Sequence, residues 1–214
     1  MTSEKLIAEL STTLQPVKSL RRPSVLALRF SAFLVVYAII TMMIQGVRPI
    51  ASLPHPMVYG AELMALLAVI ITSIIAAVHL LYPDYYQRKR FISWPFYALA
   101  FFVGMLLWQF TVFSPVQILP THYEPSHSIE CSLCVIGVAI IPSVMMLLLA
   151  RTGASVRPRL LSGYAFLLAA ALGCLLLRIV EANDDPMHLL LWHYFPTAGF
   201  AAIGAFLGKY FLKW

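Results

Sequence analysis

Long runs of apolar residues, separated by short polar connectors, dominate the chain. Six such runs each approach the roughly 17–25 residues that an α-helix needs to cross a bilayer. They lie at 25–47, 56–81, 94–113, 131–150, 160–180 and 188–208. Because the hydrocarbon core offers no partner to stray backbone groups, each run is expected to be helical. The pattern predicts an all-α integral membrane protein with a bundle of six transmembrane helices in residues 25–214.

Residues 1–24 carry a different pattern, an apolar stripe at the spacings of a short amphipathic helix. The stripe consists of Leu6, Ile7, Leu10, Leu14 and Val17. Its opposite face is mixed in charge rather than rich in lysine. Two interpretations therefore stay open: a helix that rests on the lipid surface, and a docking helix that offers its stripe to a partner protein.

Composition agrees with the membrane assignment. The 214 residues are 61% hydrophobic and only 11% charged, with a mean hydropathy of +0.84. That is too little charge for a water-soluble chain of this length. The polar first 24 residues and the long apolar run after them argue against a cleavable signal peptide. The lipid bilayer is thus the first expected partner.

The basic residues predict an orientation. Of the 15 lysines and arginines, all but Arg48 and Arg178 fall in the first 29 residues, in connectors 82–93 and 151–159, or in the C-terminal tail. By the positive-inside rule, both termini are expected to be cytoplasmic. The net charge of +6 then reflects membrane topology and gives no reason to expect direct nucleic-acid binding.

A few residues inside or beside the spans are candidate structural or coupling positions. They are Glu62, Pro142, Arg178, Asp184, Trp192 and His193. Intramembrane charge is costly and commonly functional, although Glu62 is near enough to the outer surface to pair with Arg178. The spacing of Arg178 and Glu181 also permits a pair on one helix. Pro142 is expected to kink the fourth span.

Small residues recur at four-residue spacing in the last two runs. Ala165, Ala169 and Gly173 lie in the fifth run, and Gly204 and Gly208 lie in the sixth. Such spacing predicts close helix packing within the bundle, with a homodimer contact as the alternative.

Cys131 and Cys134 lie where an outer polar connector meets the fourth run. If a helix starts near Glu130, both thiols fall in its first turn and a half, roughly 5–6 Å apart. That separation is within disulfide range, and a helix N-terminus lowers the pKa of a thiol. Three histidines expected at the same mouth add candidate metal ligands. They are His122, His127 and His188.

Three interpretations of the cysteine pair remain open. The pair is a sensor of oxidants or thiophilic metals, a catalytic dithiol that reduces quinone, or two small apolar residues that begin a helix. The catalytic interpretation ranks last, because a thiol oxidase relays through a second cysteine pair and Cys174 fits a packing role. No phosphate loop, nucleophile elbow or paired-histidine zinc helix occurs in the sequence. Neither an enzyme nor a cofactor is therefore expected, and a small-solute transporter that uses Glu62 is a further alternative.

Residues along the whole chain also form an ordered set. The set includes Leu6-Ile7, Leu10, Leu14, Pro16-Val17, Glu62, Trp94-Pro95, Cys131, Pro142, Arg151, Gly153-Ala154, Arg157-Pro158, Asp184-Asp185-Pro186, Leu190-Leu191-Trp192-His193, Gly204-Ala205 and Trp214. In order and spacing it resembles the NrsF-type bacterial membrane anti-sigma factors. The resemblance implies a multi-pass inner-membrane protein that holds an extracytoplasmic-function sigma factor inactive, with cytoplasmic residues 1–24 as the contact.

The resemblance also implies an input. Release of the sigma factor is expected when periplasmic cysteines meet oxidants or heavy metals. Cys131 matches the first of the family's periplasmic cysteines, but Glu181, Ala182 and Asn183 stand where the second is usual. Either Cys134 takes the place of that partner, or this chain senses something else.

Overall fold

The computed structural model describes residues 3–13, 20–49, 55–112, 125–181 and 183–212, and all their regular structure is helical. A short helix α1 (Ser3–Thr13) precedes the bundle. The bundle consists of α2 (Pro23–Gln45), α3 (Pro56–Leu80), η2 (Tyr85–Arg88), α4 (Lys89–Val112), α6 (Pro125–Ala150), α7 (Pro158–Val180), α8 (Pro186–Leu189), η3 (Leu190–Tyr194) and α9 (Phe195–Phe211).

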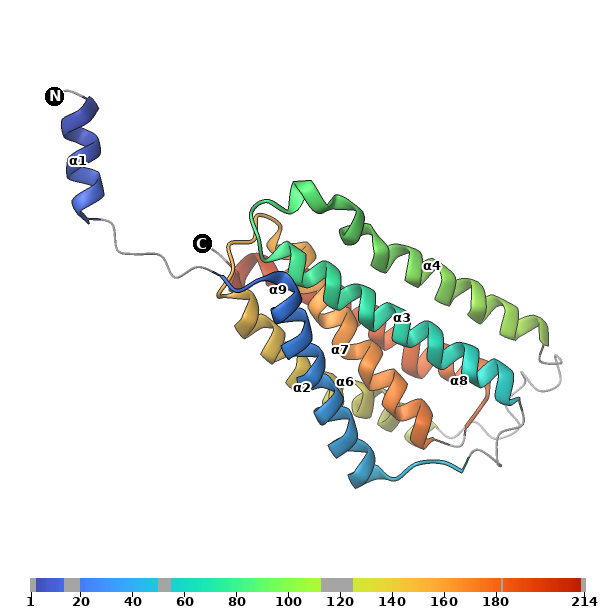
Figure 1. The fold of residues 1–214 in the computed structure, drawn as a ribbon. Coiled ribbons are helices and arrows are strands. Elements are labelled where there is room, and N and C mark those ends of the chain that lie inside the picture. Colours follow the sequence, from blue (N-terminus) through green and yellow to red (C-terminus); the bar gives the residue numbers. More distant parts are fainter. Residues whose placement is uncertain (1–2, 14–19, 50–54, 113–124, 182, 213–214) are drawn as a thin grey trace.

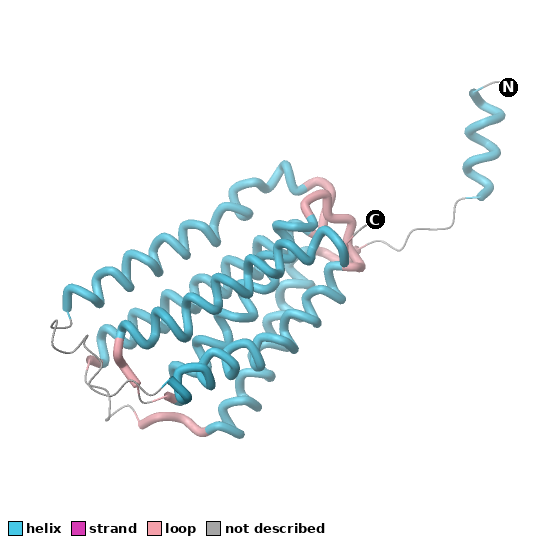
Figure 2. The backbone as a smooth tube through the Cα atoms, turned by 180° about the vertical axis from the view of Figure 1, so that it is seen from behind, coloured by secondary structure: helices cyan, strands magenta, loops and turns pink. Residues whose placement is uncertain are grey.

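Six helical segments are long and apolar enough to cross a membrane, so the predicted six-span bundle is confirmed in length and composition. The last of them joins α8, η3 and α9 into one segment, Pro186–Phe211. The long helices run side by side, and the end of α9 lies at the same end of the bundle as the start of α2 (Figures 1 and 2).

Prolines set several helix starts. Helices α2, α3, α6, α7 and α8 all begin at a proline. This position suits proline, because a first-turn residue needs no N–H for helix bonding and a φ near −65° is already helical. Pro125 therefore starts α6 six residues before the apolar run at 131, and polar residues carry the helix beyond the apolar stretch. Helix α4 likewise begins at Lys89, earlier than the predicted 94.

The early start of α6 corrects one expectation about the cysteines. Counted from Pro125, Cys131 lies in the second turn of α6 and Cys134 lies in the third. The prediction that both thiols occupy the first turn and a half is wrong. Because the field of a helix N-terminus fades within the first turn, it does not act strongly on either thiol.

Helix α7 forms the centre of the bundle, packed against α3, α6 and α9 (Figure 1). Every residue from Tyr164 to Leu176 is buried. Helix α2 is much less enclosed, with only Leu26, Phe30 and Leu34 fully buried.

The predicted close packing of small residues is confirmed within the chain. A Cβ added at Gly173 on α7 would lie 2.5 Å from the carbonyl oxygen of Val135 on α6. One added at Gly208 on α9 would overlap the carbonyl of Pro158 on α7. Glycine lets these backbones approach directly, as small residues do between membrane helices.

Pro142 lies inside α6, as expected, and deprives the carbonyl of Val138 of its helical donor. The hydroxyl of Tyr37 on α2 donates to that carbonyl at 2.9 Å. Pro196 has the same effect on Trp192, whose carbonyl accepts a hydrogen bond of 2.7 Å from the Ser132 hydroxyl. Neighbouring helices thus supply the donors that the prolines lack, as apolar surroundings require.

Candidate functional site

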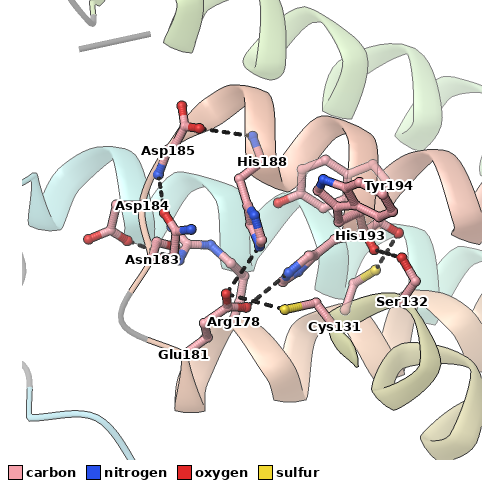
Figure 3. Close-up of polar contacts among 12 residues, drawn as sticks. Cys131, Ser132, Arg178, Glu181, Asn183, Asp184, Asp185, His188, His193 and Tyr194 are labelled. Atoms are coloured by element: carbon pink, nitrogen blue, oxygen red, sulfur yellow. Dashed lines mark hydrogen bonds and ion pairs between the residues drawn. The ribbon is translucent and has the colours of Figure 1, made fainter. Parts of the chain in front are cut away.

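Polar side chains gather at one end of the bundle, where α7 ends and α8 and η3 begin. They form two neighbouring groups (Figure 3). One is a chain of ion pairs centred on Arg178. The other, called here the Glu181 cluster, consists of Cys131, Glu181, His188 and His193, whose potential ligand atoms all lie within 4.8 Å of one another.

The ion-pair chain begins at Glu62 on α3 and Arg178 on α7, which are 1% and 3% exposed. The Arg178 guanidinium donates from Nε to Glu62 Oε1 at 3.0 Å and from Nη2 to Oε2 at 3.2 Å. Its Nη1 pairs with Asp184 at 3.0 Å. Asp184 in turn binds Arg48 through two hydrogen bonds of 3.0 and 2.9 Å. Two arginines and two carboxylates balance in charge, which buried ions require.

Neutral side chains complete the coordination of Glu62. The Gln109 amide donates to Oε2 at 3.3 Å, and the Tyr194 hydroxyl donates to Oε1. The Arg178 guanidinium also lies 5.1 Å from the centre of the Tyr59 ring, within cation–π range. Glu62 is therefore held by α3, α4, α7 and η3 together.

The intrahelical pair suggested by the spacing of Arg178 and Glu181 is absent from the contacts of the described residues. Arg178 faces Glu62 and Asp184 instead. Glu181 follows the last turn of α7, where its backbone is extended, and its carboxylate turns toward the histidines (Figure 3). A helix ends here, so the i, i+3 geometry that would bring the two side chains together is lost.

Within the Glu181 cluster, the carboxylate lies at the centre. Its Oε1 is 3.2 Å from His188 Nε2 and 3.5 Å from Cys131 Sγ, while Oε2 is 2.9 Å from His193 Nε2. The two imidazole contacts have ion-pair distances but lack the alignment of a hydrogen bond, so neither Nε2 is satisfied as a donor or acceptor. His193 is 0% exposed.

The histidines control the charge of Glu181. Burial alone would raise the pKa of this carboxyl group, but its interactions with His188 and His193 outweigh burial and lower the pKa to about 2. Glu181 is therefore ionised throughout the neutral range. The cluster presents a fixed negative charge between two imidazoles and a thiol.

A π-helical turn brings the two histidines together. Residues Leu190–Tyr194 form η3, in which Phe195 N–H bonds to the carbonyl of Leu190, five residues earlier. In a regular α-helix, residues five apart point well away from each other. The wider turn rotates His193 back toward His188, and the ring centres lie 5.5 Å apart. Single π-turns of this kind occur frequently at functional sites.

Neighbouring groups fix the backbone around these ligands. The Ser132 hydroxyl, next to Cys131, holds the carbonyl of Trp192, next to His193. The Thr197 hydroxyl donates to the His193 carbonyl at 2.8 Å. The Asp185 carboxylate caps α8 by accepting from the N–H of His188 at 3.2 Å, the usual role of aspartate at a helix start.

The cysteines fall into three environments. Cys131 faces Glu181, Cys134 is exposed, and Cys174 is buried in α7, where its sulfur lies 2.9 Å from the Thr197 hydroxyl. None of the three forms a disulfide. The structure thus brings Cys131 and His188 together with His193, a residue expected only in a structural or coupling role.

Other predicted positions are described only in part. Leu14, Val17 and His122 lie outside the described residues, and the side chains of Leu6, Leu10 and His127 do too. Ile7 of the predicted contact stripe is 65% exposed on α1.

Sequence reasoning did not single out Glu181 as a site residue, although it occupies the position where the resembled family has its second cysteine. Arg48 also carried a signal, because it is one of two basic residues on the otherwise base-poor side. Nothing in the sequence indicated that Gln109 and Tyr194 form hydrogen bonds with Glu62.

The fold, with its six long apolar helices, is that of a multi-pass α-helical membrane protein. The sequence model of the NrsF family, described as a negative regulator of sigma F, matches residues 10–214. The chain belongs to this family, so the resemblance seen in the sequence is confirmed and a sigma factor is its partner. No curated protein and no solved structure matches the chain.

Proposed function

We propose that the chain is an anti-sigma factor that sequesters an extracytoplasmic-function sigma factor at the bacterial inner membrane. A periplasmic redox or heavy-metal signal then releases the partner. Family membership over residues 10–214 is the observation that carries the regulatory assignment. The identity of the sigma-factor class, the topology and the signal are parts of the proposal.

The output is proposed to reside in residues 1–24. In α1 the described side chains are exposed, including Ile7 on the apolar stripe. An amphipathic helix whose stripe exposes an apolar side chain such as Ile7 suits binding in a groove of a partner protein. The basic residues before α2 and within connectors 82–93 and 151–159 support a cytoplasmic location for this segment.

The input is proposed to reside at the Glu181 end, around Cys131. The positive-inside pattern supports a periplasmic location for this end, which is an oxidising compartment. A coupling of about 1–3 kcal/mol between this end and the partner contact would be typical of allosteric proteins.

Deletion of residues 1–24 tests the output. The full-length chain and the truncated chain are purified in detergent and compared for co-purification of the host's extracytoplasmic-function sigma factors. Full-length protein is expected to retain one of them, and the truncated protein is expected to lose it. A matched control, Glu4→Gln on the polar face of α1, should retain binding. Undiminished binding by the truncated protein would refute the proposal.

The two rival functions have less support. A quinone-linked thiol oxidoreductase needs a relay, yet Cys174 is buried in α7 and is far in sequence from Cys131 and Cys134. A transporter would need Glu62 in a water-filled path, whereas Glu62 is 1% exposed and paired with Arg178. Anaerobic titration with a soluble quinone and uptake into liposomes test these alternatives directly.

A further inference from the structure

We propose that Cys131, Glu181, His188 and His193 form a four-ligand binding site for a borderline divalent transition-metal ion of the Zn²⁺ class. The inference rests on the proposed function only for the step in which the ion acts as the signal. The site itself is argued from the geometry and chemistry of the Glu181 cluster.

The spacing of the ligand atoms fits one ion. A tetrahedral Zn²⁺ site with bonds of about 2.0–2.3 Å places its ligand atoms roughly 3.3–3.8 Å apart. The Glu181 carboxylate lies 3.5 Å from Cys131 Sγ and 3.2 Å from His188 Nε2. His193 Nε2 lies 2.9 Å from the second carboxylate oxygen. Because the four ligand atoms all lie within 4.8 Å of one another, shifts of at most about 1 Å would place them around a common centre.

The unsatisfied nitrogens point to a cation. His193 is fully buried, and its Nε2 faces Glu181 at an ion-pair distance but without the alignment of a hydrogen bond (Figure 3). His188 Nε2 and Glu181 Oε2 are also buried without a hydrogen-bond partner. Buried polar atoms are nearly always satisfied, and leaving one without a partner costs about 1–3 kcal/mol. A metal ion would satisfy these atoms together.

The ligand types select the class of metal. One sulfur, two imidazole nitrogens and one carboxylate oxygen suit Zn²⁺ and its neighbours, whereas Ca²⁺ and Mg²⁺ prefer oxygen ligands alone. Binding would transfer the Cys131 thiol proton to solvent, so that thiolate and Glu181 carboxylate together balance the dication. A neutral assembly of this kind suits a site at the end of a membrane bundle.

The surrounding contacts resemble those that orient metal ligands in general. Ser132 and Thr197 fix the backbone on both sides of His193, and Asp185 fixes the backbone of His188. Outer contacts hold ligating side chains in position, and their loss typically weakens metal binding about 10–100-fold.

Cys134 provides the matched control. It lies on the same helix, three residues after Cys131, but it is exposed and is not a member of the cluster. If the site is the one proposed, replacement of Cys134 leaves metal binding unchanged. If metal binding instead uses the pair of cysteines, both replacements abolish it.

Metal binding is measured on the full chain in detergent by titration with Zn²⁺ and, for spectroscopy, with Co²⁺. One ion per chain is expected, with a thiolate-to-cobalt charge-transfer band. The variants Cys131→Ser and His193→Gln should weaken Zn²⁺ binding by more than 100-fold, beyond the outer-shell range, and Cys131→Ser should lose the charge-transfer band. Cys134→Ser should match the unmodified chain in both measurements.

Three outcomes would overturn the site: no stoichiometric binding to a folded chain, equal loss in Cys134→Ser, or a charge-transfer band that survives Cys131→Ser. Ligand variants could lose metal binding simply because they misfold. Ser132→Ala tests the site independently, because it leaves all four ligands in place. It should bind Zn²⁺ with an affinity lowered about 10–100-fold, and unchanged affinity would contradict the proposed positioning.

A release experiment separates this proposal from the proposed function. Zn²⁺ is added to the full-length complex with the sigma factor. If Zn²⁺ binds at the cluster without release, the site stands and the proposed metal signal fails. If an oxidant releases the sigma factor while Zn²⁺ does not bind, the site fails and the anti-sigma function stands.

Discussion

The hydroxyl of Tyr37 on α2 donates a hydrogen bond of 2.9 Å to the backbone carbonyl of Val138 on α6. That carbonyl lacks its helical donor because Pro142, four residues later, has no N–H. A side chain on the first span therefore completes the backbone of the fourth. The same helix α2 buries few residues otherwise, so this bond is one of its specific attachments to the bundle.

Replacement of Tyr37 by phenylalanine tests this attachment. Tyr37→Phe keeps the ring but leaves the Val138 carbonyl unsatisfied in apolar surroundings. We expect a loss of about 0.6 kcal/mol, and at most about 1.7 kcal/mol, in the free energy of unfolding, the average and the maximum for hydrogen bonds between membrane helices. Reversible unfolding in mixed micelles measures it. Tyr97→Phe, at an exposed position of α4, should have no effect.

The buried pair of Glu62 and Arg178 gives a larger prediction. Arg178→Met leaves the Glu62 carboxylate buried without its cation, which should cost about 3–5 kcal/mol in the free energy of unfolding. The double variant Glu62→Gln, Arg178→Met removes both charges and should recover part of this loss. A double-mutant cycle in mixed micelles measures the coupling. Additive losses would show that the two side chains do not stabilise each other.

Glycine packing predicts opposite outcomes for two similar substitutions on helices of the bundle. Gly173→Ala would place a methyl group 2.5 Å from the Val135 carbonyl oxygen, and such overpacking costs about 1–3 kcal/mol. Gly137→Ala, with nothing within 4 Å of the new Cβ, should be neutral or stabilising by up to about 1 kcal/mol. Thermal unfolding in detergent compares them. Equal effects would contradict the close contact between α6 and α7.

The predicted topology can be tested with single cysteines in a chain whose own three are serine. Thr152→Cys lies in the connector between α6 and α7, and Asn183→Cys lies between α7 and α8; both positions are exposed. By the positive-inside rule, a membrane-impermeant maleimide added to intact spheroplasts should label only Asn183→Cys. Labelling of Thr152→Cys alone would invert the topology and place the Glu181 cluster in the cytoplasm.

The spans were predictable because a bilayer imposes a length and an apolar composition on each crossing helix. The boundaries of the helices were less predictable, because the helical backbone does not end where the apolar run ends. Pro125 starts α6 within polar sequence, and this moves Cys131 from the first turn to the second. The proline that precedes the apolar run was the sequence signal that could have placed the start of α6.

The Glu181 cluster was only half predictable. Cys131 and His188 were predicted as candidate ligands from their residue types. Glu181 occupies the region where the resembled family usually has its second cysteine. His193 joins them through the π-turn at Leu190–Tyr194, which no three- or four-residue pattern predicts. Pairing across helices, such as Gln109 with Glu62, depends on the order in which helices surround α7. That order is a property of tertiary packing.

The glycine contacts of α7 have a mechanical consequence. Toward its C-terminal end, α7 is in close backbone contact with α6 at Gly173. At its N-terminal end, α7 is in close contact with Gly208 of α9. Because rotation of α7 would press its backbone against theirs at these two contacts, we expect the three helices to move together as one block. Helix α2, to which residues 1–22 are joined, contacts α7 and also α3, and it bonds to α6 through Tyr37. A displacement of the block would thus be transmitted to the N-terminal segment as a change in the tilt of α2.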